Sequence, residues 1–505
     1  MSALIVGAGP VGLTAGIELL RRDVPARIVD RVDHPHPHSK SIVLWPRAIE
    51  AFARFGAADE ILDRGLRLTA QNYYSGGRRK LRLGFGRVRG TSYPYAVSLP
   101  QQDTEDVLRG ALRRFGGKIE FGVRLTALSQ DADGVRAELA TSDTTSTFGA
   151  PWLIGADGSR STVREQLGVP FDGATYPQQF LLADGECDTP LAHDEAHYFM
   201  TPKGVLVVVG LPGGLYRVFV SVAPGVDTTD AREVIQAAAT ERSPVPVRLV
   251  GEQRTGLFQV QRRMAGRFRE GRVLLAGDAA HIHSPAGAQG LNTGIEDASA
   301  LAWRLARTGE GPAAAALDVW ERERMHIAER VVTDTDRQTR MWMLSGWRRT
   351  ARDLALAAGQ RTGFTDRVVA PRQAQLDLTL PGRAERLGKL AAGARVPDHP
   401  LGSGGTLHDE LRFGEPVLLV LTAASAHPSA PERARRFLAT ARVPDGVRTA
   451  VIGQAEDPDG RLHKEFGIRE PSTVLVRPDG VIDFLAPLSE EPRITAALRS
   501  WSTGA

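Results

Sequence analysis

The chain contains a single cysteine, Cys187, in 505 residues. One cysteine excludes an intrachain disulfide, a CxxC redox pair and a cysteine-based metal cluster. Long hydrophobic runs are also missing, since "VLVVVGL" at 205–211 and "PVLLVL" at 416–421 fall far below the about 20 residues that cross a bilayer. The first ten residues lack the basic segment of a signal peptide. We therefore expect a cytoplasmic protein with no membrane partner.

A strong excess of charge of either sign is equally absent. Lys and Arg number 63 against 59 Asp and Glu, which gives a net charge of +4. The basic residues are scattered among acids, so we expect no nucleic-acid partner. We interpret "HPHPH" at 34–38 as a proline-rich loop rather than a metal site, and we expect no metal in this protein.

Strand-like and helix-like segments alternate along the chain, which is typical of an α/β protein. Residues 176–262 alternate like antiparallel strands and predict an inserted sheet domain. A stretch rich in Gly, Pro and Ala at 381–400 predicts a boundary between two domains. Beyond it we expect a small, separate α/β domain with a hairpin that turns at Pro478-Asp479-Gly480.

The first motif is Gly7-x-Gly9-x-x-Gly12, which follows the strand "ALIV" and opens a helix. Gly7 allows a tight turn, Gly9 lets a pyrophosphate approach the backbone, and Gly12 permits close packing of helix on strand. Asp30 ends the next strand, where a carboxylate accepts hydrogen bonds from a ribose and disfavours a 2′-phosphate. The pattern favours FAD or NAD over NADP, with a purely structural βα turn as the alternative.

The second motif lies at residues 272–306. The strand "RVLLAG" brings Asp278 to its carboxyl end, and the loop "SPAGAQGLNTG" leads into a helix from about residue 291. The carboxylate can bind a polyol such as a ribityl chain, and the helix start favours negative charge on a flavin. The alternative is an N-cap followed by a glycine loop. A third motif, "WLIGADGSRSTVRE", carries Asp157 and is read equally well as a cofactor loop or as a turn with an N-cap.

Together and in this order, the three motifs resemble those of the FAD-dependent aromatic hydroxylases, the single-component flavoprotein monooxygenases, over residues 3–375. The resemblance implies one FAD on a Rossmann-like fold similar to that of p-hydroxybenzoate hydroxylase, reduced transiently by NADPH or NADH. It further implies that a flavin C4a-hydroperoxide transfers one oxygen atom of O2 to a phenolic, quinonoid or polyketide-derived small aromatic substrate. A Baeyer–Villiger oxygenase or an epoxidase would share these motifs and remains the alternative.

The resemblance also assigns cofactor contacts by position. Asp30 would hold the adenosine ribose, Asp278 the ribityl chain, and Asp157 would serve both FAD and NAD(P)H. The other assignments place residues near the adenine, the pyrophosphate or the flavin ring. The expected contacts are Gly7, Gly9, Pro10, Val11, Gly12, Asp30, Arg31, Lys40, Ser41, Gln101, Leu125, Asp157, Gly277, Asp278, Pro285, Gly287, Ala288, Gln289, Gly290, Leu291 and Asn292.

One position departs from the family pattern. The family usually reads P-x-G-G-x-G, whereas this chain has Ala288 at the second central position. Alanine keeps the backbone amide but adds a Cβ and disfavours positive φ. We expect FAD binding to survive, and we expect any effect to fall on flavin mobility or substrate clearance.

The last part of the chain resembles the thioredoxin-like tail of the longer family members. Its first strand is followed by "TAASAHPS" without cysteine, so we expect a packing or dimer role rather than dithiol chemistry. Pro471 falls where such folds place a cis-proline. The expected organisation is a monomer or homodimer with an FAD-binding domain at 1–72, 100–175 and 265–340, a substrate sheet at 73–99 and 176–264, a helical linker at 341–390 and a thioredoxin-like domain at 391–505.

The substrate is expected between the inserted sheet and the flavin. The candidates form a mostly apolar set that suits a flat aromatic molecule, namely Tyr73, Phe199, Val207, Val209, Leu211 and Phe219. Strand alternation leaves even odds that each one faces the flavin. No catalytic base is identified; His283 is a candidate, although we favour a loop hydrogen-bonding role for it. This chain lacks the WxWxIP segment that a flavin halogenase would carry. A flavin-binding scaffold protein without enzymatic activity is the alternative from a different functional class.

Overall fold

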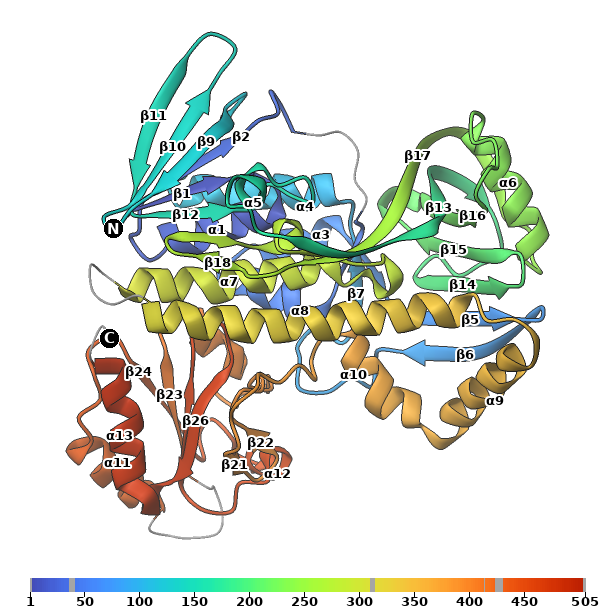
Figure 1. Cartoon of the computed structure of the whole chain (residues 1–505). Helices are drawn as coiled ribbons and strands as arrows, with labels where there is room; N and C mark the ends of the chain where they lie inside the picture. Colours follow the sequence, from blue (N-terminus) through green and yellow to red (C-terminus); the bar gives the residue numbers. More distant parts are fainter. Residues whose placement is uncertain (1, 36–40, 309–313, 413, 423–429, 503–505) are drawn as a thin grey trace.

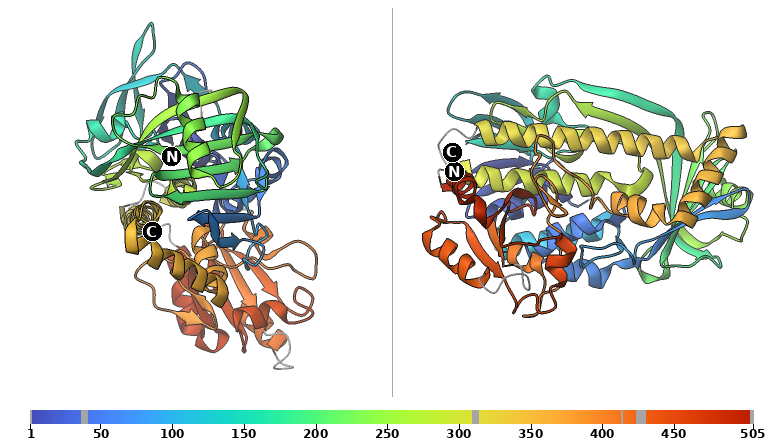
Figure 2. Two further views of the ribbon diagram at one scale, coloured as in Figure 1. Left: turned by 90° about the vertical axis from the view of Figure 1, so that its right-hand side faces the viewer. Right: turned by 90° about the horizontal axis from the view of Figure 1, so that it is seen from below.

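A computed structural model of the chain describes residues 2–35, 41–308, 314–412, 414–422 and 430–502 (Figures 1 and 2). Two long helices run side by side across the molecule, α7 (Gly290–Thr308) and α8 (Ala314–Trp342). The first sheet-containing part and most of the second lie on one side of this pair, and the C-terminal part lies on the other (Figure 1). Within the described ranges, the helices lack the combination of length and apolar character that crossing a membrane requires.

The first part is built on a six-stranded sheet with the order β18-β19-β12-β1-β2-β8. All neighbours are parallel except β18 and β19. Its central strands are buried on both faces, as parallel sheets covered by helices require. The strands are β1 (Ala3–Val6), β2 (Ala26–Asp30), β8 (Ile119–Phe121), β12 (Trp152–Gly155), β18 (Arg269–Glu270) and β19 (Val273–Leu275).

Helices and two small sheets surround this central sheet. The helices α1 and α7 pack together, and α4 packs beside α1. The helices here are α1 (Pro10–Leu20), α2 (Pro46–Ala53), α3 (Ala58–Arg64), α4 (Gln101–Arg114) and α5 (Thr162–Gln166). The small sheets consist of β3 (Val43–Leu44), β4 (Leu66–Leu68) and β7 (Ala96–Ser98), and of β9 (Arg124–Gln130), β10 (Val135–Ala140) and β11 (Thr145–Ala150).

The second part is an eight-stranded sheet with the order β20-β17-β13-β16-β15-β14-β5-β6. It is antiparallel except for one pair, because β14 runs parallel to β5. Helix α6 (Ala231–Arg242) covers one face, and the other face looks toward the first part. The strands are β5 (Ala70–Ser75), β6 (Arg78–Gly84), β13 (Phe171–Asp188), β14 (Glu195–Thr201), β15 (Gly204–Gly210), β16 (Tyr216–Val222), β17 (Arg248–Ala265) and β20 (His281–Ile282).

After α8 the chain forms α9 (Gly346–Thr362) and α10 (Ala370–Gln373), which pack near β5 and β6 (Figure 1). It then enters the C-terminal part, a four-stranded sheet with the order β24-β23-β25-β26. Strands β23 and β24 are parallel, and the other pairs are antiparallel. The elements are β23 (Val417–Leu421), α11 (Ala430–Thr440), β24 (Arg448–Ile452), α12 (Arg461–Phe466), β25 (Ser472–Val476), β26 (Ile482–Pro487) and α13 (Glu491–Ser502).

Two separate apolar clusters cover the two faces of this C-terminal sheet, as a two-layer α/β unit requires. The cis geometry predicted before Pro471 is wrong, because among the described residues no peptide bond is cis. The backbone there leads straight into β25, and the Leu488 amide donates to the Pro471 carbonyl oxygen at 2.8 Å.

Candidate functional site

The first glycine motif forms the turn between β1 and α1. A Cβ on Gly7 would lie 2.3 Å from the Ala156 carbonyl oxygen, and one on Gly12 would lie 1.9 Å from the Gly7 carbonyl oxygen. A Cβ on Gly9, in contrast, would meet nothing within 4 Å. Gly9 also begins α1 without a side-chain cap. The turn therefore leaves open space in front of an uncapped helix N-terminus, which fits a pyrophosphate.

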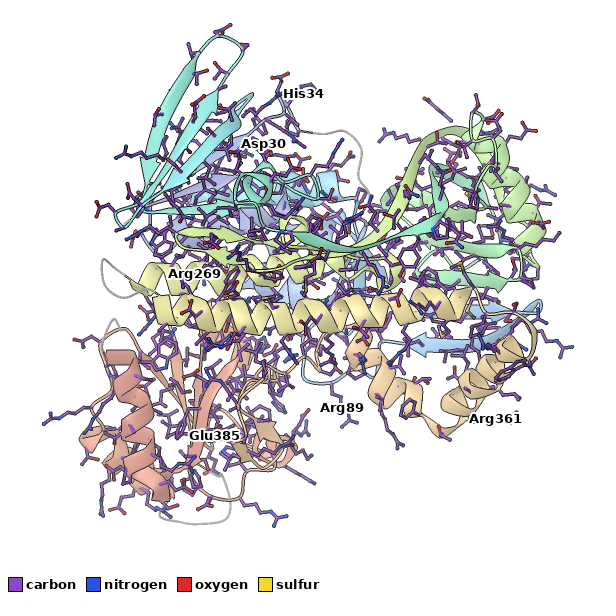
Figure 3. The ribbon with its side chains drawn as sticks, viewed as in Figure 1. Asp30, His34, Arg89, Arg269, Arg361 and Glu385 are labelled. Atoms are coloured by element: carbon purple, nitrogen blue, oxygen red, sulfur yellow. The ribbon has the colours of Figure 1, made fainter. Side chains whose placement is uncertain are left out.

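Asp30 lies at the end of β2, close to this turn (Figure 3). Its two carboxylate oxygens accept hydrogen bonds from the amides of Ala8, at 2.7 Å, and Val32, at 3.1 Å. The carbonyl oxygen of Asp30 accepts from the Val123 amide at 2.9 Å, just before β9 begins. Asp30 therefore fixes the glycine turn while its carboxylate stays half-buried at the sheet edge.

The remaining residues expected near the adenosine half lie around this edge. Leu125 is buried in the main core on β9, and Arg31 is exposed. The Gln101 amide donates to the Ser41 carbonyl oxygen at 3.0 Å, so the start of α4 meets the segment before β3. Lys40 lies outside the described residues.

Asp157 follows β12 and caps α5. Its carboxylate accepts from the Ser161 hydroxyl and from the Val163 amide, and burial raises its pKa above the ordinary value. Ser161 is the N-cap, since its hydroxyl accepts from the Arg164 amide at 3.0 Å. Arg164 is buried and donates to the Ala279 carbonyl oxygen at 2.9 Å. The structure therefore contains the capped turn, and Arg164 ties it to the 277–280 loop, while the cofactor role of Asp157 stays a prediction.

The second glycine loop lies directly against the first. A Cβ on Gly277 would come within 2.7 Å of Val11 Cγ2, and so would a Cβ on Gly294. The starts of α1 and α7 therefore meet at the carboxyl edge of the parallel sheet, where doubly wound folds bind ligands. Asp278 is exposed at this junction. The two glycine loops therefore lie side by side at one edge of the sheet.

The loop from Pro285 to Asn292 is held by an unusual set of hydrogen bonds. The Gly287 carbonyl oxygen accepts from Trp45 Nε1 at 2.8 Å and from the side-chain amides of Gln289 and Gln373, both at 3.0 Å. Asn292 accepts from the Trp45 amide at 2.7 Å and donates to the Ala288 carbonyl oxygen at 2.8 Å. This loop is rigid enough to hold Ala288 at φ +53°.

Two histidines flank this loop. His281 Nε2 lies 2.7 Å from Asp297 Oδ2, and Asp297 also binds Arg324. Burial alone would raise the pKa of Asp297, but Arg324 and His281 hold it at about 2. Burial lowers the pKa of His283 to about 4, and its Nδ1 lies 2.9 Å from the Ser284 carbonyl oxygen. His283 is therefore neutral at pH 7 and tied to the loop.

The residues expected to face the substrate divide between the two faces of the eight-stranded sheet. Tyr73, Val207, Val209, Leu211 and Phe219 lie on the inner face, toward the glycine loops. Phe199 lies on the outer face under α6, so its expected position is wrong. Neighbouring residues of a strand point to opposite faces, and β14 runs with its even-numbered residues inward.

The inner face carries aromatic residues that the sequence reasoning missed. Tyr198 stacks on Tyr73 with ring centroids 4.9 Å apart. Phe180 stacks on Phe219 at 4.9 Å and on Phe258 at 5.9 Å. The missed residues are Tyr198, Phe180 and Phe258. Their signal is the strand register, because they lie on the same face as Tyr73 and Phe219, at neighbouring cross-strand positions.

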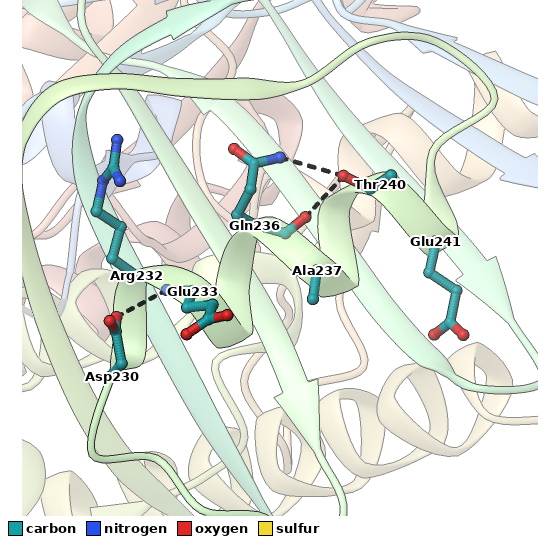
Figure 4. Close-up of a pocket in the computed structure, with 7 residues that line it drawn as sticks. All are labelled: Asp230, Arg232, Glu233, Gln236, Ala237, Thr240 and Glu241. Atoms are coloured by element: carbon teal, nitrogen blue, oxygen red, sulfur yellow. Dashed lines mark hydrogen bonds between the residues drawn. The ribbon is translucent and has the colours of Figure 1, made fainter.

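A cavity of about 700 Å³ opens between this inner face and the start of α4. Apolar groups of Pro100, Leu211, Leu215, Leu257 and Phe258 line it, together with the charged side chains of Asp103, Asp184, Glu186, Glu252 and Arg254. A second hollow, of about 580 Å³, runs along α6 and is lined by residues 230–241 alone (Figure 4). Because α6 covers the outer face, this second hollow is separated from the glycine loops by the sheet.

Comparison with known proteins identifies the family. Residues 1–335 match the family described as "FAD binding domain", and residues 389–505 match "Aromatic-ring hydroxylase, C-terminal". The chain is 33% identical to pentachlorophenol 4-monooxygenase of Sphingobium chlorophenolicum, over 98% of this chain and 96% of that protein. It is also 33% identical to 6-methylpretetramide 4-monooxygenase of Streptomyces rimosus, over 98% and 93%.

The fold agrees with these matches. The structure of anhydrotetracycline hydroxylase from Streptomyces rimosus superposes with a TM-score of 0.79 at 30% identity, and the match covers 100% of both chains. The glycine turn, the acidic strand ends and the helix starts gather at one edge of the parallel sheet. The chain therefore belongs to the FAD-dependent aromatic-ring monooxygenases, which use NAD(P)H and O2.

Proposed function

We propose that this monooxygenase hydroxylates a flat phenolic molecule of several fused rings, of the polyketide type. The observation that carries the proposal is the cavity of about 700 Å³ between the inner face and α4. Its volume falls within the range of sites for drug-sized ligands and exceeds what one phenol ring fills. The likeness to enzymes named for 6-methylpretetramide and anhydrotetracycline supports the same class.

The apolar wall of the cavity supports recognition by stacking. Phe258 lines the cavity and leans on Phe180 and Phe219, which hold its ring in place. A flat aromatic ring gains both burial and offset stacking against such a wall. At the rim, Arg254 and Asp103 offer a donor and an acceptor to hydroxyl or carbonyl groups.

We propose that FAD binds across the two adjacent glycine loops, with its pyrophosphate at Gly9 and its ribose at Asp30. Asp278 would accept from the ribityl hydroxyls, and the positive end of α7 would stabilise negative charge on the flavin ring. When bound and reduced by NAD(P)H, FAD would activate O2, so that one oxygen atom goes to the substrate and the other leaves as water. The protein then contributes orientation, through the rigid 285–292 loop, and exclusion of water from the inner face.

Asp278→Ala tests this placement directly. Loss of a charged acceptor costs about 1.5–3 kcal/mol, so the FAD dissociation constant should rise about 10- to 100-fold. Titration of the apoenzyme with FAD measures it. Asp143→Ala, at an exposed hairpin tip, is the control. An Asp278→Ala enzyme that keeps full FAD occupancy on dilution would remove Asp278 from the site.

The substrate class is tested by NAD(P)H oxidation with a panel of single-ring phenols, quinones and fused-ring phenols, with mass spectrometry of the products. We expect coupled turnover and a gain of one oxygen atom with the fused-ring compounds. Coupled turnover with single-ring phenols alone would contradict the proposal. Insertion of the oxygen atom into a ring C–C bond would assign Baeyer–Villiger chemistry instead.

We propose that the C-terminal part is a thioredoxin-like domain that has lost dithiol chemistry. The order β24-β23-β25-β26, with one parallel pair and helices on both faces, supports this fold. We propose an FAD-binding domain at 1–72, 100–175 and 265–340 and a substrate sheet at 73–99 and 176–264. A helical linker at 341–390 and the thioredoxin-like domain at 391–505 complete the proposed organisation. A monomer or homodimer is proposed for the assembly, and sedimentation velocity distinguishes the two.

A further inference from the structure

One buried turn of the C-terminal part reaches into the first part. Asp479, in the turn between β25 and β26, is 2% exposed. Its carboxylate accepts from Trp303 Nε1 of α7 at 3.1 Å, and its carbonyl oxygen accepts from Arg47 Nη2 of α2 at 3.1 Å. The turn thus contacts two helices that belong to the cofactor-binding part.

Buried ion pairs extend this contact to α8. Arg477 binds Asp479 at 2.6 Å and Glu323 of α8 at 2.9 Å. Glu323 also binds Arg304 of α7 at 2.6 Å. These side chains are at most 6% exposed, so each charge depends on its partners rather than on water.

The same two helices, α7 and α8, also hold the loop at residues 277–281, here named the flavin loop. Arg324, the neighbour of Glu323, binds Asp297 Oδ1 at 2.7 Å. Asp297 Oδ2 accepts from the Gly277 amide at 3.1 Å and lies 2.7 Å from His281 Nε2.

On α7 a second route runs in parallel. Arg47 joins the carbonyl oxygen of Asp479 to Glu296, which precedes Asp297, with a distance of 2.9 Å to the Glu296 carboxylate. Asp479 and the flavin loop are therefore linked by pairs on adjacent residues of the same two helices.

We propose that Asp479 is a positioning residue for the flavin end of the cofactor site. It acts through Arg477 on Glu323 of α8, and through Arg47 on Glu296 of α7. A displacement of either helix separates buried charges, so the docked turn holds the start of α7 and the Gly277 loop in register. This gives the C-terminal part a role in cofactor retention that needs no cysteine. The inference rests on the FAD placement proposed above.

The test is Asp479→Asn, which keeps the shape of the side chain and removes its charge. Asp483→Asn is the control in the same hairpin, because Asp483 accepts from Trp501 Nε1 at 3.0 Å and pairs with Arg383 at 2.9 Å, whereas the donors to Asp479 are Trp303 and Arg47. We measure the FAD dissociation constant of each full-length apoenzyme and the visible spectrum of each holoenzyme. We expect the dissociation constant of Asp479→Asn to rise about tenfold, with a shifted flavin spectrum, and that of Asp483→Asn to stay within about twofold.

Equal FAD affinities for the two variants would overturn the proposal. If Asp479→Asn does not fold, Trp303→Phe removes the indole donor to Asp479 and reduces the stacking of Trp303 on Trp501. Trp501→Phe reduces the same stacking but leaves the donor to Asp479 in place. Weaker FAD binding by Trp303→Phe but not by Trp501→Phe supports the proposal, and equal binding refutes it. Failure of the cofactor placement itself is separate, because it would show as unchanged affinity in Asp278→Ala.

Discussion

At residue 288 the chain holds an alanine in a conformation that favours glycine, with φ +53°. The left-handed region costs a residue with a Cβ about 1–2 kcal/mol, whereas glycine loses about 0.5–1 kcal/mol through the entropy of the unfolded chain. The backbone strain of alanine therefore exceeds the entropy that glycine loses. We expect Ala288→Gly to raise the free energy of unfolding by up to about 1 kcal/mol with FAD binding retained.

Urea unfolding of the holoenzyme measures this difference. Ala286→Gly is the control, since Ala286 is buried in the same loop without positive φ and should lose stability. A loss of stability in both variants would show that the loop gains more from the Ala288 methyl group than it loses in strain.

His283 makes the stability of the loop depend on pH. Its pKa is about 4 in the folded chain against an ordinary 6.5, so the unfolded chain takes up a proton first as the pH falls. Stability is therefore complete above pH 6.5 and is lost between pH 6.5 and 4, by about 2 kcal/mol at pH 5. We expect His283→Gln to lack this loss in unfolding measured at pH 7 and pH 5.

His34→Gln, on an exposed loop (Figure 3), should retain the loss of stability seen in the unsubstituted protein. Because His283 is neutral throughout the working range, His283→Gln should also keep the pH profile of kcat. An altered pH profile of kcat in His283→Gln would show that His283 acts as a general acid or base.

Single residues could be predicted from the sequence where the reason is local. Gly12 follows from its close contact with Gly7 in the same turn, and the departure at Ala288 could be read from its neighbours. Asp479 could not be predicted, because Trp303 lies 176 residues away along the chain. The same holds for Trp45, whose indole donates across 242 residues to Gly287.

Among the elements, the strands of the eight-stranded sheet could be predicted from the hydrophobic pattern, but the face to which each side chain points could not. The apolar runs predict β14 and β15, but an almost continuous apolar strand gives no sign of which residues face inward. Register with β5 and β16 decides it, and it places Tyr198 inward and Phe199 outward.

The two faces should respond differently to truncation. Phe258→Ala removes a stacking partner from the cavity, and we expect KM for a fused-ring substrate to rise about 3- to 10-fold. Phe199→Ala leaves a void under α6, and we expect a loss of about 3–5 kcal/mol in stability without a change in KM. Steady-state kinetics and urea unfolding on both variants separate these effects. A raised KM in Phe199→Ala would mean that both faces contribute to the substrate site.

At the scale of the whole molecule, the C-terminal part is joined to the rest by buried charges. Arg477 is 2% exposed and binds Glu323 across 154 residues. Separation of the two parts would leave several charges without partners, so the chain should unfold as one cooperative unit. Differential scanning calorimetry of the full chain should show a single transition.

Arg477→Leu should break this cooperativity. The substitution leaves Asp479 and Glu323 buried without their shared cation, which costs about 3–5 kcal/mol. Because the loss falls at the interface and not in either core, we expect a separate transition at lower temperature for the C-terminal part. Arg493→Gln, at an exposed pair with Glu490, should leave the single transition in place. If Arg477→Leu also melts in one transition at the unaltered temperature, apolar packing rather than paired charge joins the two parts.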